Sequence, residues 1–450
     1  MTPLLKNIKP IYRDRIPPQL VIQITNQCNA QCPQCGMRVT AKIPRSTLDI
    51  DTIKRTLDAA AAKGVQAVSF TGGEPLLHLD LLTELIRHAG KAGIEYIRTG
   101  TNGFLFKSSH RPGFEDRVKT LAEKLADTPL RNFWISLDSA IPSVHEQMRG
   151  LDGVVRGIEK ALPIFHSNGL YPSVNLGINR LVGGDPTRLL GRHAYTSEDR
   201  YIHAFYAAFR RAFDQFYRQA ANLGFTIVNT CYPMSMGDQE QDLGLSAVYA
   251  ATAVDNVVRF SKREKSALYR ALMDVIPHHR HRLRIFTPLS SLYMLARQYD
   301  TDQVRSSHME VGCRGGIDFF FMDSENGHVF PCGYRGNENM GSFADIDLPR
   351  IDPRAECRKC DWECFRDPSE LFAPFLDLFN RPGGLVRRFI QDPAYFSLWQ
   401  NDIRYYRACT LFNGRSAPDP KRLSRFDLNR NIRQQKSYAA SMLSLRSKAS

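Results

Sequence analysis

Three cysteines lie close together near the start of this 450-residue chain, at Cys28, Cys32 and Cys35. They are spaced C-x3-C-x2-C, and the β-branched, apolar stretch 19–25 before them predicts a loop that leaves a strand. Thiolates are soft ligands that favour iron–sulfur clusters or zinc. A tetrahedral zinc site would need a fourth ligand nearby, and residues 36–40 offer none. Two interpretations remain: an iron–sulfur cluster with one iron that has no protein ligand, or a zinc site whose fourth ligand is distant in the sequence.

Five more cysteines lie in a second group, which begins with Cys313, Gly327 and Cys332 and ends with Cys357-x2-Cys360-x3-Cys364. Such a group can hold an iron–sulfur cluster or, through its last four cysteines, a zinc ribbon. Cys231 and Cys409 stand apart. Cys231 could relay a thiyl radical, although a buried free cysteine is the simpler interpretation.

Strand-like and helix-like stretches alternate through the first half of the chain. The predicted strands are 19–25, 65–71, 94–101, 132–138, 172–178 and 225–230, and the helical patterns between them include 51–63, 80–92, 117–126, 153–168 and 197–222. Phenylalanines recur along 197–222, which favours core packing over a substrate wall. The alternation predicts an α/β fold with a parallel sheet, an open and partial (β/α)6 barrel.

Polar residues follow the predicted strands where a parallel barrel places its working face. After the second strand comes Thr71-Gly-Gly-Glu-Pro75, in which the glycines let a ligand approach the backbone and Glu74 can pair with an ammonium group. An ordinary strand-to-helix turn is the alternative. Further candidates at strand ends are Asn102, Ser136, Asp138, Arg149, Asn175 and Ile178.

The cysteine spacing after a first strand, followed by Gly-Gly-Glu-Pro, resembles the radical S-adenosylmethionine (radical SAM) superfamily. The resemblance implies that Cys28, Cys32 and Cys35 hold a catalytic [4Fe-4S] cluster whose fourth iron is chelated by SAM. It implies reductive cleavage of SAM to a 5′-deoxyadenosyl radical, which abstracts hydrogen from a substrate. The SAM-binding residues that it implies are Gly72, Gly73, Glu74, Pro75, Asn102, Ser136, Asp138, Arg149, Asn175 and Ile178.

The second cysteine group resembles the SPASM or twitch extension of radical SAM enzymes, which opens C-x9–15-G-x4-C. The resemblance implies at least one auxiliary [4Fe-4S] cluster, and it leaves a second cluster open. The implied ligands are Cys313, Cys332, Cys357, Cys360 and Cys364. The expected organisation is an N-terminal arm (1–18), a radical SAM core (19–237), a helical bridge (238–312), an auxiliary domain with a β-hairpin and an Asn-Gly turn (313–366), and a helical region with a basic tail (367–450).

The chain is basic, with 60 Lys and Arg against 46 Asp and Glu, and 43% of it is hydrophobic. A net charge of +14 favours anionic partners, although residues 421–450 alone carry eight Lys or Arg against Asp427. Neither an 18-residue apolar run nor a signal-peptide pattern is present, so we expect a cytoplasmic enzyme. The family resemblance implies an electron donor such as flavodoxin or ferredoxin.

The substrate is the least constrained property. We expect oxidative modification of a peptide or protein side chain. The alternative is oxidation or rearrangement of a small metabolite, such as a sugar, an aminocyclitol or another natural-product intermediate. RNA modification is disfavoured, because the basic residues are not interleaved with aromatics in a recognisable module.

Overall fold

The computed structural model describes residues 8–30, 32, 33, 35, 45–234, 243–248, 256–300 and 311–428. At its centre lies a nine-stranded sheet of order β7-β6-β5-β4-β3-β2-β1-β8-β9. The strands are β1 (Gln19–Thr25), β2 (Ala67–Gly72), β3 (Tyr96–Thr101), β4 (Asn132–Ser136), β5 (Ser173–Gly177), β6 (Ile227–Cys231), β7 (Arg284–Ile285), β8 (Phe319–Met322) and β9 (Val329–Phe330).

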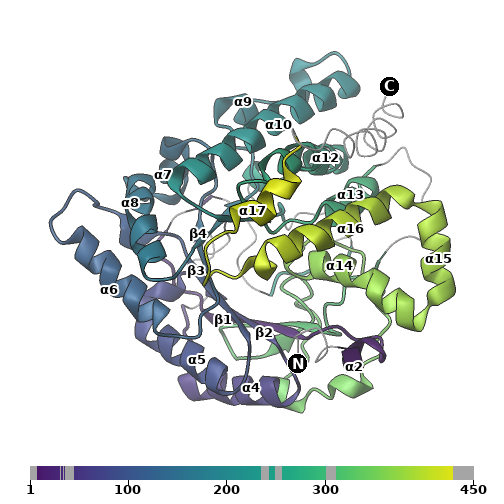
Figure 1. The fold of residues 1–450 in the computed structure, drawn as a ribbon, viewed down its shortest axis with the longest axis horizontal. Coiled ribbons are helices and arrows are strands. Elements are labelled where there is room, and N and C mark those ends of the chain that lie inside the picture. Colours follow the sequence, from purple (N-terminus) through teal and green to yellow (C-terminus); the bar gives the residue numbers. More distant parts are fainter. Residues whose placement is uncertain are drawn as a thin grey trace.

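The predicted open (β/α)6 arrangement is confirmed. Strands β1 to β6 pair in parallel and in chain order, each within two residues of its predicted ends. Helices connect the strands along the outside of the sheet (Figure 1). The main ones are α4 (Ile50–Ala62), α5 (Leu79–Lys91), α6 (Phe114–Ala126), α7 (Pro142–Arg149), α8 (Val154–Ser167), α10 (Glu198–Leu223) and α12 (Lys262–His279).

Two further strands lengthen the parallel sheet beyond the six predicted ones. Strand β7 has only two residues and pairs with β6, so no sequence pattern marks it. Strand β8 pairs in parallel with the other side of β1, with Gln19 opposite Phe319. The hairpin that begins the second cysteine group therefore continues the sheet of the first.

The loop of that hairpin is longer than a two-residue Asn-Gly turn. Met322 pairs with Val329, so residues 323–328 form the loop. Oδ1 of Asp323 accepts hydrogen bonds from the backbone N–H groups of residues 325–328. Gly327 adopts a φ of +69° there. The Asp323 side chain thus organises the turn that the Asn-Gly pair was predicted to make alone.

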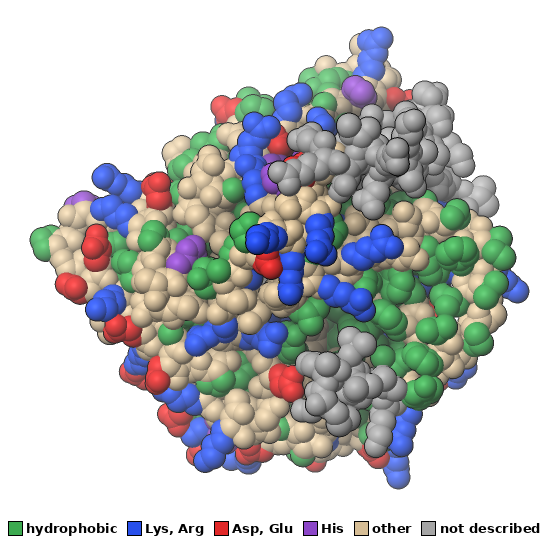
Figure 2. All heavy atoms as spheres, in the orientation of Figure 1, with side chains coloured by type: hydrophobic (Ala, Val, Ile, Leu, Met, Phe, Trp, Pro, Cys, Tyr) green, Lys and Arg blue, Asp and Glu red, His purple; other side chains and the backbone are tan. Residues whose placement is uncertain are grey.

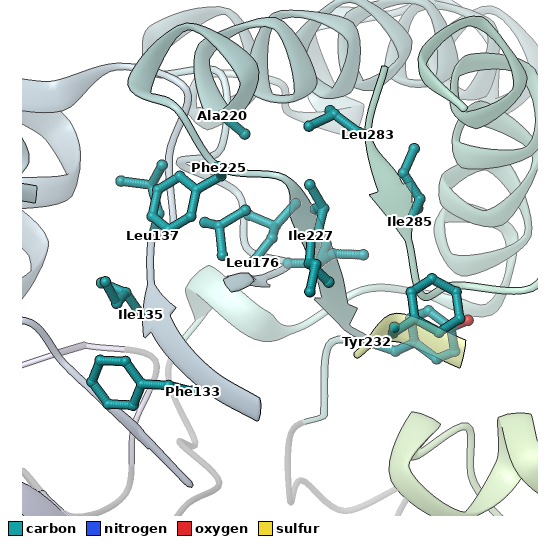
Figure 3. Close-up of a cluster of buried hydrophobic side chains, with 14 of the residues drawn as sticks. Phe133, Ile135, Leu137, Leu176, Ala220, Phe225, Ile227, Tyr232, Leu283 and Ile285 are labelled. Carbon is teal, nitrogen blue, oxygen red and sulfur yellow. The ribbon is translucent and has the colours of Figure 1, made fainter. Parts of the chain in front are cut away.

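The main hydrophobic core lies between the sheet and its helices. Side chains of β4, β5, β6 and β7 belong to it together with Ala220 of α10 (Figure 3). Phe205, Phe209, Phe213 and Phe216 of α10 are fully buried, which confirms their prediction as core.

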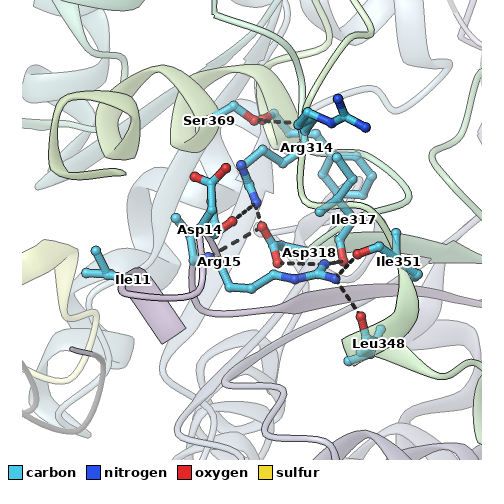
Figure 4. Close-up of polar contacts among 12 residues, drawn as sticks. Ile11, Asp14, Arg15, Arg314, Ile317, Asp318, Leu348, Ile351 and Ser369 are labelled. Carbon is cyan, nitrogen blue, oxygen red and sulfur yellow. Dashed lines mark hydrogen bonds and ion pairs between the residues drawn. The ribbon is translucent and has the colours of Figure 1, made fainter. Parts of the chain in front are cut away.

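The N-terminal arm is tied to the C-terminal half of the chain. Arg15 donates hydrogen bonds to the carbonyls of Ile317 (2.9 Å) and Leu348 (2.5 Å) and pairs with Asp318 at 3.5 Å (Figure 4). Arg314 pairs with Asp318 and donates to the backbone carbonyl of Asp14. These contacts join residues about 300 positions apart, so the part of the arm around Asp14 and Arg15 belongs to the folded body.

The C-terminal region is helical, as predicted. Its helices are α14 (Glu363–Asn380), α15 (Pro382–Gln391), α16 (Pro393–Ala408) and α17 (Pro420–Leu423), whereas α13 (Leu289–Gln298) lies in the predicted bridge. On α15 the usual polarity is reversed, because Arg388 is buried against Glu370 whereas Val386, Phe389 and Ile390 are exposed. Hydrophobic side chains gather over this part of the surface in Figure 2. Residues 1–7, parts of the predicted bridge and the basic tail from 429 lie outside the described residues.

Candidate active site

The first cysteine loop follows β1 at the carboxyl edge of the sheet. Backbone hydrogen bonds join it to the end of β2, from Gly73 N to Thr25 O (2.9 Å) and from Glu74 N to Gln27 O (2.8 Å). Cys32 is buried, and its carbonyl oxygen accepts a hydrogen bond from the backbone N–H of Cys35 at 3.1 Å. The three cysteines and the Gly-Gly-Glu-Pro turn therefore form one unit.

The two glycines of this turn are required by close approach. A Cβ on Gly73 would lie 2.1 Å from the carbonyl oxygen of Gln27, and one on Gly72 would lie 2.4 Å from that of Thr25. Both obstacles are backbone atoms, which cannot move without shifting the cysteine loop. The glycines thus set the distance between the turn and the loop.

Glu74 is buried beside this turn, and protein donors already occupy its carboxylate. Its Oε2 accepts from the backbone N–H of Asn102 (2.6 Å), and Oε1 accepts from that of Leu76 (3.0 Å). Burial raises the pKa of Glu74 to about 7, although these hydrogen bonds oppose the shift. Glu74 therefore joins the ends of β2 and β3. Its predicted contact with a SAM ammonium group stays a prediction.

Asp138 and Arg149 form a buried ion pair behind the cysteine loop. Nε and Nη2 of Arg149 each lie 2.7 Å from Oδ2 of Asp138. Burial raises the pKa of Cys32, whereas the nearby Arg149 lowers it. The two residues were predicted to contact SAM separately, and the structure places them against each other.

His145 supports this pair from α7. Its Nδ1 accepts a hydrogen bond from the backbone N–H of Asp138 at 3.0 Å, and burial lowers its pKa to about 3. The ring is therefore neutral at physiological pH.

The other predicted SAM-binding residues differ in how far they are buried. Ser136 ends β4 and is partly exposed, and Asn102 donates from Nδ2 to Oδ1 of Asn29 at 2.9 Å. Pro75 is buried and begins a helical turn (Pro75–His78). Ile178 is 2% exposed within the main core, and its backbone N–H binds the carbonyl of Cys231.

Four cysteines of the second group lie around one another. Cys313 and Cys357 form a backbone bridge, with Cys313 N bound to Cys357 O at 2.7 Å. Burial raises the pKa of Cys332 to about 12, with further contributions from Cys313 and Cys357. Burial also raises the pKa of Cys360, and Cys332 and Cys313 add to it. Cys313, Cys332, Cys357 and Cys360 therefore make one group.

Cys364, the fifth predicted ligand, faces other partners. Its thiol donates to Oε1 of Glu363 at 3.6 Å, and Glu363 also hydrogen-bonds Cys231 at the end of β6. The thiol of Cys231 exchanges hydrogen bonds with Asn175 of β5, at 3.2 and 3.3 Å. This line of polar groups crosses the inner face of the sheet.

That inner face carries a residue that the sequence reading missed, Arg98 of β3. Arg98 is the single charged residue in β1 to β6, all of which the structure describes. Its Nε donates to Oγ of Ser69 at 2.9 Å, and its charge acts on Cys364. Burial lowers the pKa of Arg98. A single charged residue among otherwise uncharged parallel strands was the available signal.

The residues around the second cysteine group fit an anionic cluster. Arg366 is buried, and its Nε and Nη1 have no hydrogen-bond partner among the described residues. Its charge lowers the pKa of Cys313, against the larger effect of burial. A thiolate-bound cluster would supply the missing negative charge. Within the described residues, no group of three or more His, Cys, Asp or Glu side chains is arranged to hold a single metal ion.

Comparison with known proteins identifies the first part of the chain. Residues 22–185 match the radical SAM superfamily model. The chain contains a radical SAM domain. Enzymes of this superfamily use a [4Fe-4S] cluster and SAM, and the cysteine loop and the Gly-Gly turn of this domain lie within the matched residues.

Two curated relatives match different lengths of the chain. An AdoMet-dependent heme synthase from Methanosarcina barkeri is 22% identical over 341 residues, which cover 73% of this chain and 82% of that protein. A probable GTP 3′,8-cyclase from Thermococcus kodakarensis is 31% identical over 163 residues, or 36% of this chain and 48% of that protein. The match thus spans about half of the cyclase.

Two solved structures align with most of this chain at low sequence identity. Streptococcus suis SuiB bound to S-adenosylmethionine has a TM-score of 0.47 at 17% identity, covering 77% of this chain and 68% of that chain. The structure of anSMEcpe with bound AdoMet has a TM-score of 0.45 at 15% identity, covering 82% of this chain and 98% of that chain. In the part of this chain that the structure describes, none of the helices is long and apolar enough to cross a membrane.

Proposed function

We propose that this chain is a radical SAM enzyme that binds SAM beside Cys28, Cys32 and Cys35 and removes hydrogen from a small-molecule substrate. The observation that carries the proposal is the meeting of the cysteine loop, the Gly72–Gly73 turn and the Asp138–Arg149 pair at one edge of the sheet. The cluster and SAM, when bound and reduced, supply a 5′-deoxyadenosyl radical.

The chain's own residues position and shield this chemistry. The Gly72–Gly73 backbone offers a ligand an approach without side chains, and Glu74 fixes that backbone against Asn102. Arg149 supplies a buried positive charge next to Cys32. Ser136 and Asn175 present hydrogen-bonding groups on the partly exposed inner face, where ribose hydroxyls or a substrate can bind.

An auxiliary [4Fe-4S] cluster held by Cys313, Cys332, Cys357 and Cys360 is part of the proposal. The mutual proximity of these thiols supports it, and so do the unpartnered Nε and Nη1 of the buried Arg366. Cys364 is assigned here to the Glu363 and Cys231 cluster, rather than to iron. An external reductant, of the flavodoxin or ferredoxin kind, would deliver electrons.

Small-molecule chemistry is favoured by the named relatives. The heme synthase and the GTP 3′,8-cyclase are both named for small molecules, and the former covers most of this chain. The SPASM-like spacing of the second cysteine group favours a second candidate, oxidative modification of a peptide side chain.

Iron content and SAM cleavage test the proposal together. The anaerobically reconstituted protein should hold about eight irons, as two clusters, and form 5′-deoxyadenosine with SAM and dithionite. Replacing Cys28, Cys32 and Cys35 by Ala should abolish 5′-deoxyadenosine and leave about four irons. Cys360→Ala should lose auxiliary iron, whereas Cys364→Ala should keep it. Persistent SAM cleavage in the triple variant would contradict the proposal.

A further inference from the structure

The inner face of the sheet is polar and partly exposed, in contrast to the buried outer face. In β4, β5 and β6 the same two positions are partly exposed and the rest are buried: Trp134 and Ser136, Asn175 and Gly177, Asn229 and Cys231. The strand registers place these residues side by side, with Ser136 opposite Asn175 and Asn175 opposite Asn229. They line an accessible space within the curve of the sheet.

Arg98 projects from the same face. It pairs in register with Ser69 of β2 and Asn132 of β4, and Asn132 lies two residues before Trp134, so Arg98 and Trp134 share one side of the sheet. Trp134 fills the space above Gly100, where a Cβ would lie 2.1 Å from its indole nitrogen. Arg98 is partly exposed although its strand is central. Its guanidinium therefore borders the same space.

The charge of Arg98 has no carboxylate partner among the described residues. Its neighbours are the hydroxyl of Ser69, which accepts one N–H, and the thiol of Cys364. The nearby carboxyl, Glu363, instead binds Cys231, Cys364 and the backbone N–H of Tyr232. A guanidinium in such a position has donors left for a planar oxyanion, which it can bind through two hydrogen bonds.

We propose that Arg98 is the anchor for an anionic group of the substrate, a carboxylate or a phosphate, in the polar space on the inner face. The inference rests on the proposed function and adds the chemical class of the substrate. With the anion held by Arg98, the rest of the substrate extends across the face toward Asn175 and Cys231 and toward the SAM-binding edge at Ser136. The neutral groups along this path suit hydroxyl or amide substituents.

Equilibrium dialysis of the reconstituted holoenzyme tests this site with two labelled probes, succinate and inorganic phosphate, at constant ionic strength. The variants are Arg98→Met, which removes the charge, and Arg98→Lys, which keeps a point charge. The matched control is Arg87→Met, at an exposed arginine of α5 paired with Asp127. Iron content and thermal unfolding are recorded for each protein.

The wild-type enzyme and Arg87→Met should bind one of the probes with the same affinity, and the bound probe distinguishes carboxylate from phosphate. Arg98→Met should bind it at least about tenfold more weakly, and Arg98→Lys should fall between them. If Arg98→Met loses iron or fails to fold, the Arg98→Lys comparison decides. The inference would be overturned if a folded, iron-loaded Arg98 variant bound the probe as tightly as the wild type. It would also be overturned if the wild type bound neither probe.

The proposed function is tested separately, by measuring SAM cleavage in the same protein preparations. Formation of 5′-deoxyadenosine from SAM and dithionite needs no substrate anion, so it is measured for the wild type and for the exposed control Arg87→Met, which should cleave SAM equally. If the wild-type protein cleaves SAM but binds neither probe, the proposed anion site is wrong and the radical SAM assignment stands. If the wild-type protein does not cleave SAM, the proposed radical SAM function is wrong, whatever the dialysis shows.

Discussion

Nε of Arg149 lies 2.7 Å from Oδ2 of Asp138, eleven residues earlier in the chain, and both side chains are buried beside Cys32. The pair joins the loop after β4 to the end of α7. It also holds the Arg149 charge close to Cys32, where it lowers the pKa of a thiol that must become a thiolate to bind iron, although Asp138 opposes this effect. The same contact therefore serves the stability of the loop and the electrostatics of the cluster site.

Breaking this pair should be costly. Arg149→Met leaves the Asp138 carboxylate buried without its partner, and we expect a loss of about 3–5 kcal/mol in the free energy of unfolding. The measurement is denaturant-induced unfolding of the cluster-free protein. Removing the exposed Arg87–Asp127 pair through Arg87→Met should cost less than about 1 kcal/mol. Equal costs for the two variants would show that the buried pair contributes little.

Gly73→Ala should displace the first cysteine loop. Its Cβ would lie 2.1 Å from Gln27 O, so we expect about 1–3 kcal/mol of destabilisation and a selective loss of SAM affinity. Gly383→Ala is the control, because no atom lies within 4 Å of its added Cβ. The readout is SAM binding by the reconstituted variants. Normal binding by Gly73→Ala would mean that the loop adapts freely.

Glu74→Gln removes the charge of the carboxylate and replaces one acceptor oxygen by an NH2 group. That group would face a backbone N–H of Asn102 or Leu76, so one buried hydrogen bond is lost. Such a bond to a charged group contributes about 1.5–3 kcal/mol. The turn loses this energy, so we expect SAM affinity to fall by at most roughly 10- to 150-fold while the cluster persists. Unchanged affinity with an intact cluster would show that this turn does not position SAM.

His145 should make the protein sensitive to mild acid. Its folded pKa of about 3 lies below the ordinary value of 6.5, so the unfolded chain takes up the proton first. The stability that the neutral ring contributes is complete above pH 6.5 and is lost progressively as the pH falls toward 3. Between pH 7.5 and 5.5 this amounts to about 1 kcal/mol.

The variant His145→Asn isolates this effect. Asn can accept the N–H bond of Asp138 but does not titrate. Thermal unfolding midpoints of the cluster-free proteins at the two pH values give the comparison. The wild type should lose more stability than the variant on acidification. Parallel losses would assign the acid sensitivity to other groups.

Short-range sequence patterns were sufficient to predict most of the strands and helices of this fold. The alternation of apolar residues located β1 to β6, and the aromatic stripe of α10 marked its buried face. Partners distant in sequence could not be predicted. The bond from Asn102 to Glu74 and the line from Cys231 to Cys364 depend on how loops and α14 meet over the sheet. The sequence shows Arg98 as a charge within a predicted strand, but the residues that surround its side chain could not be predicted from it.

The parallel pairing of β1 with β8 also bears on how the chain is made. One side of β1 stays without its neighbour until residues 319–322 have been synthesised, 300 positions later. At translation rates of about 5–20 residues per second, that interval lasts roughly 15–60 s. An open strand edge during this time can pair with other chains. Yield of the protein in a cell should therefore depend on chaperones that guard the nascent N-terminal half, and a chain cut before β8 should aggregate.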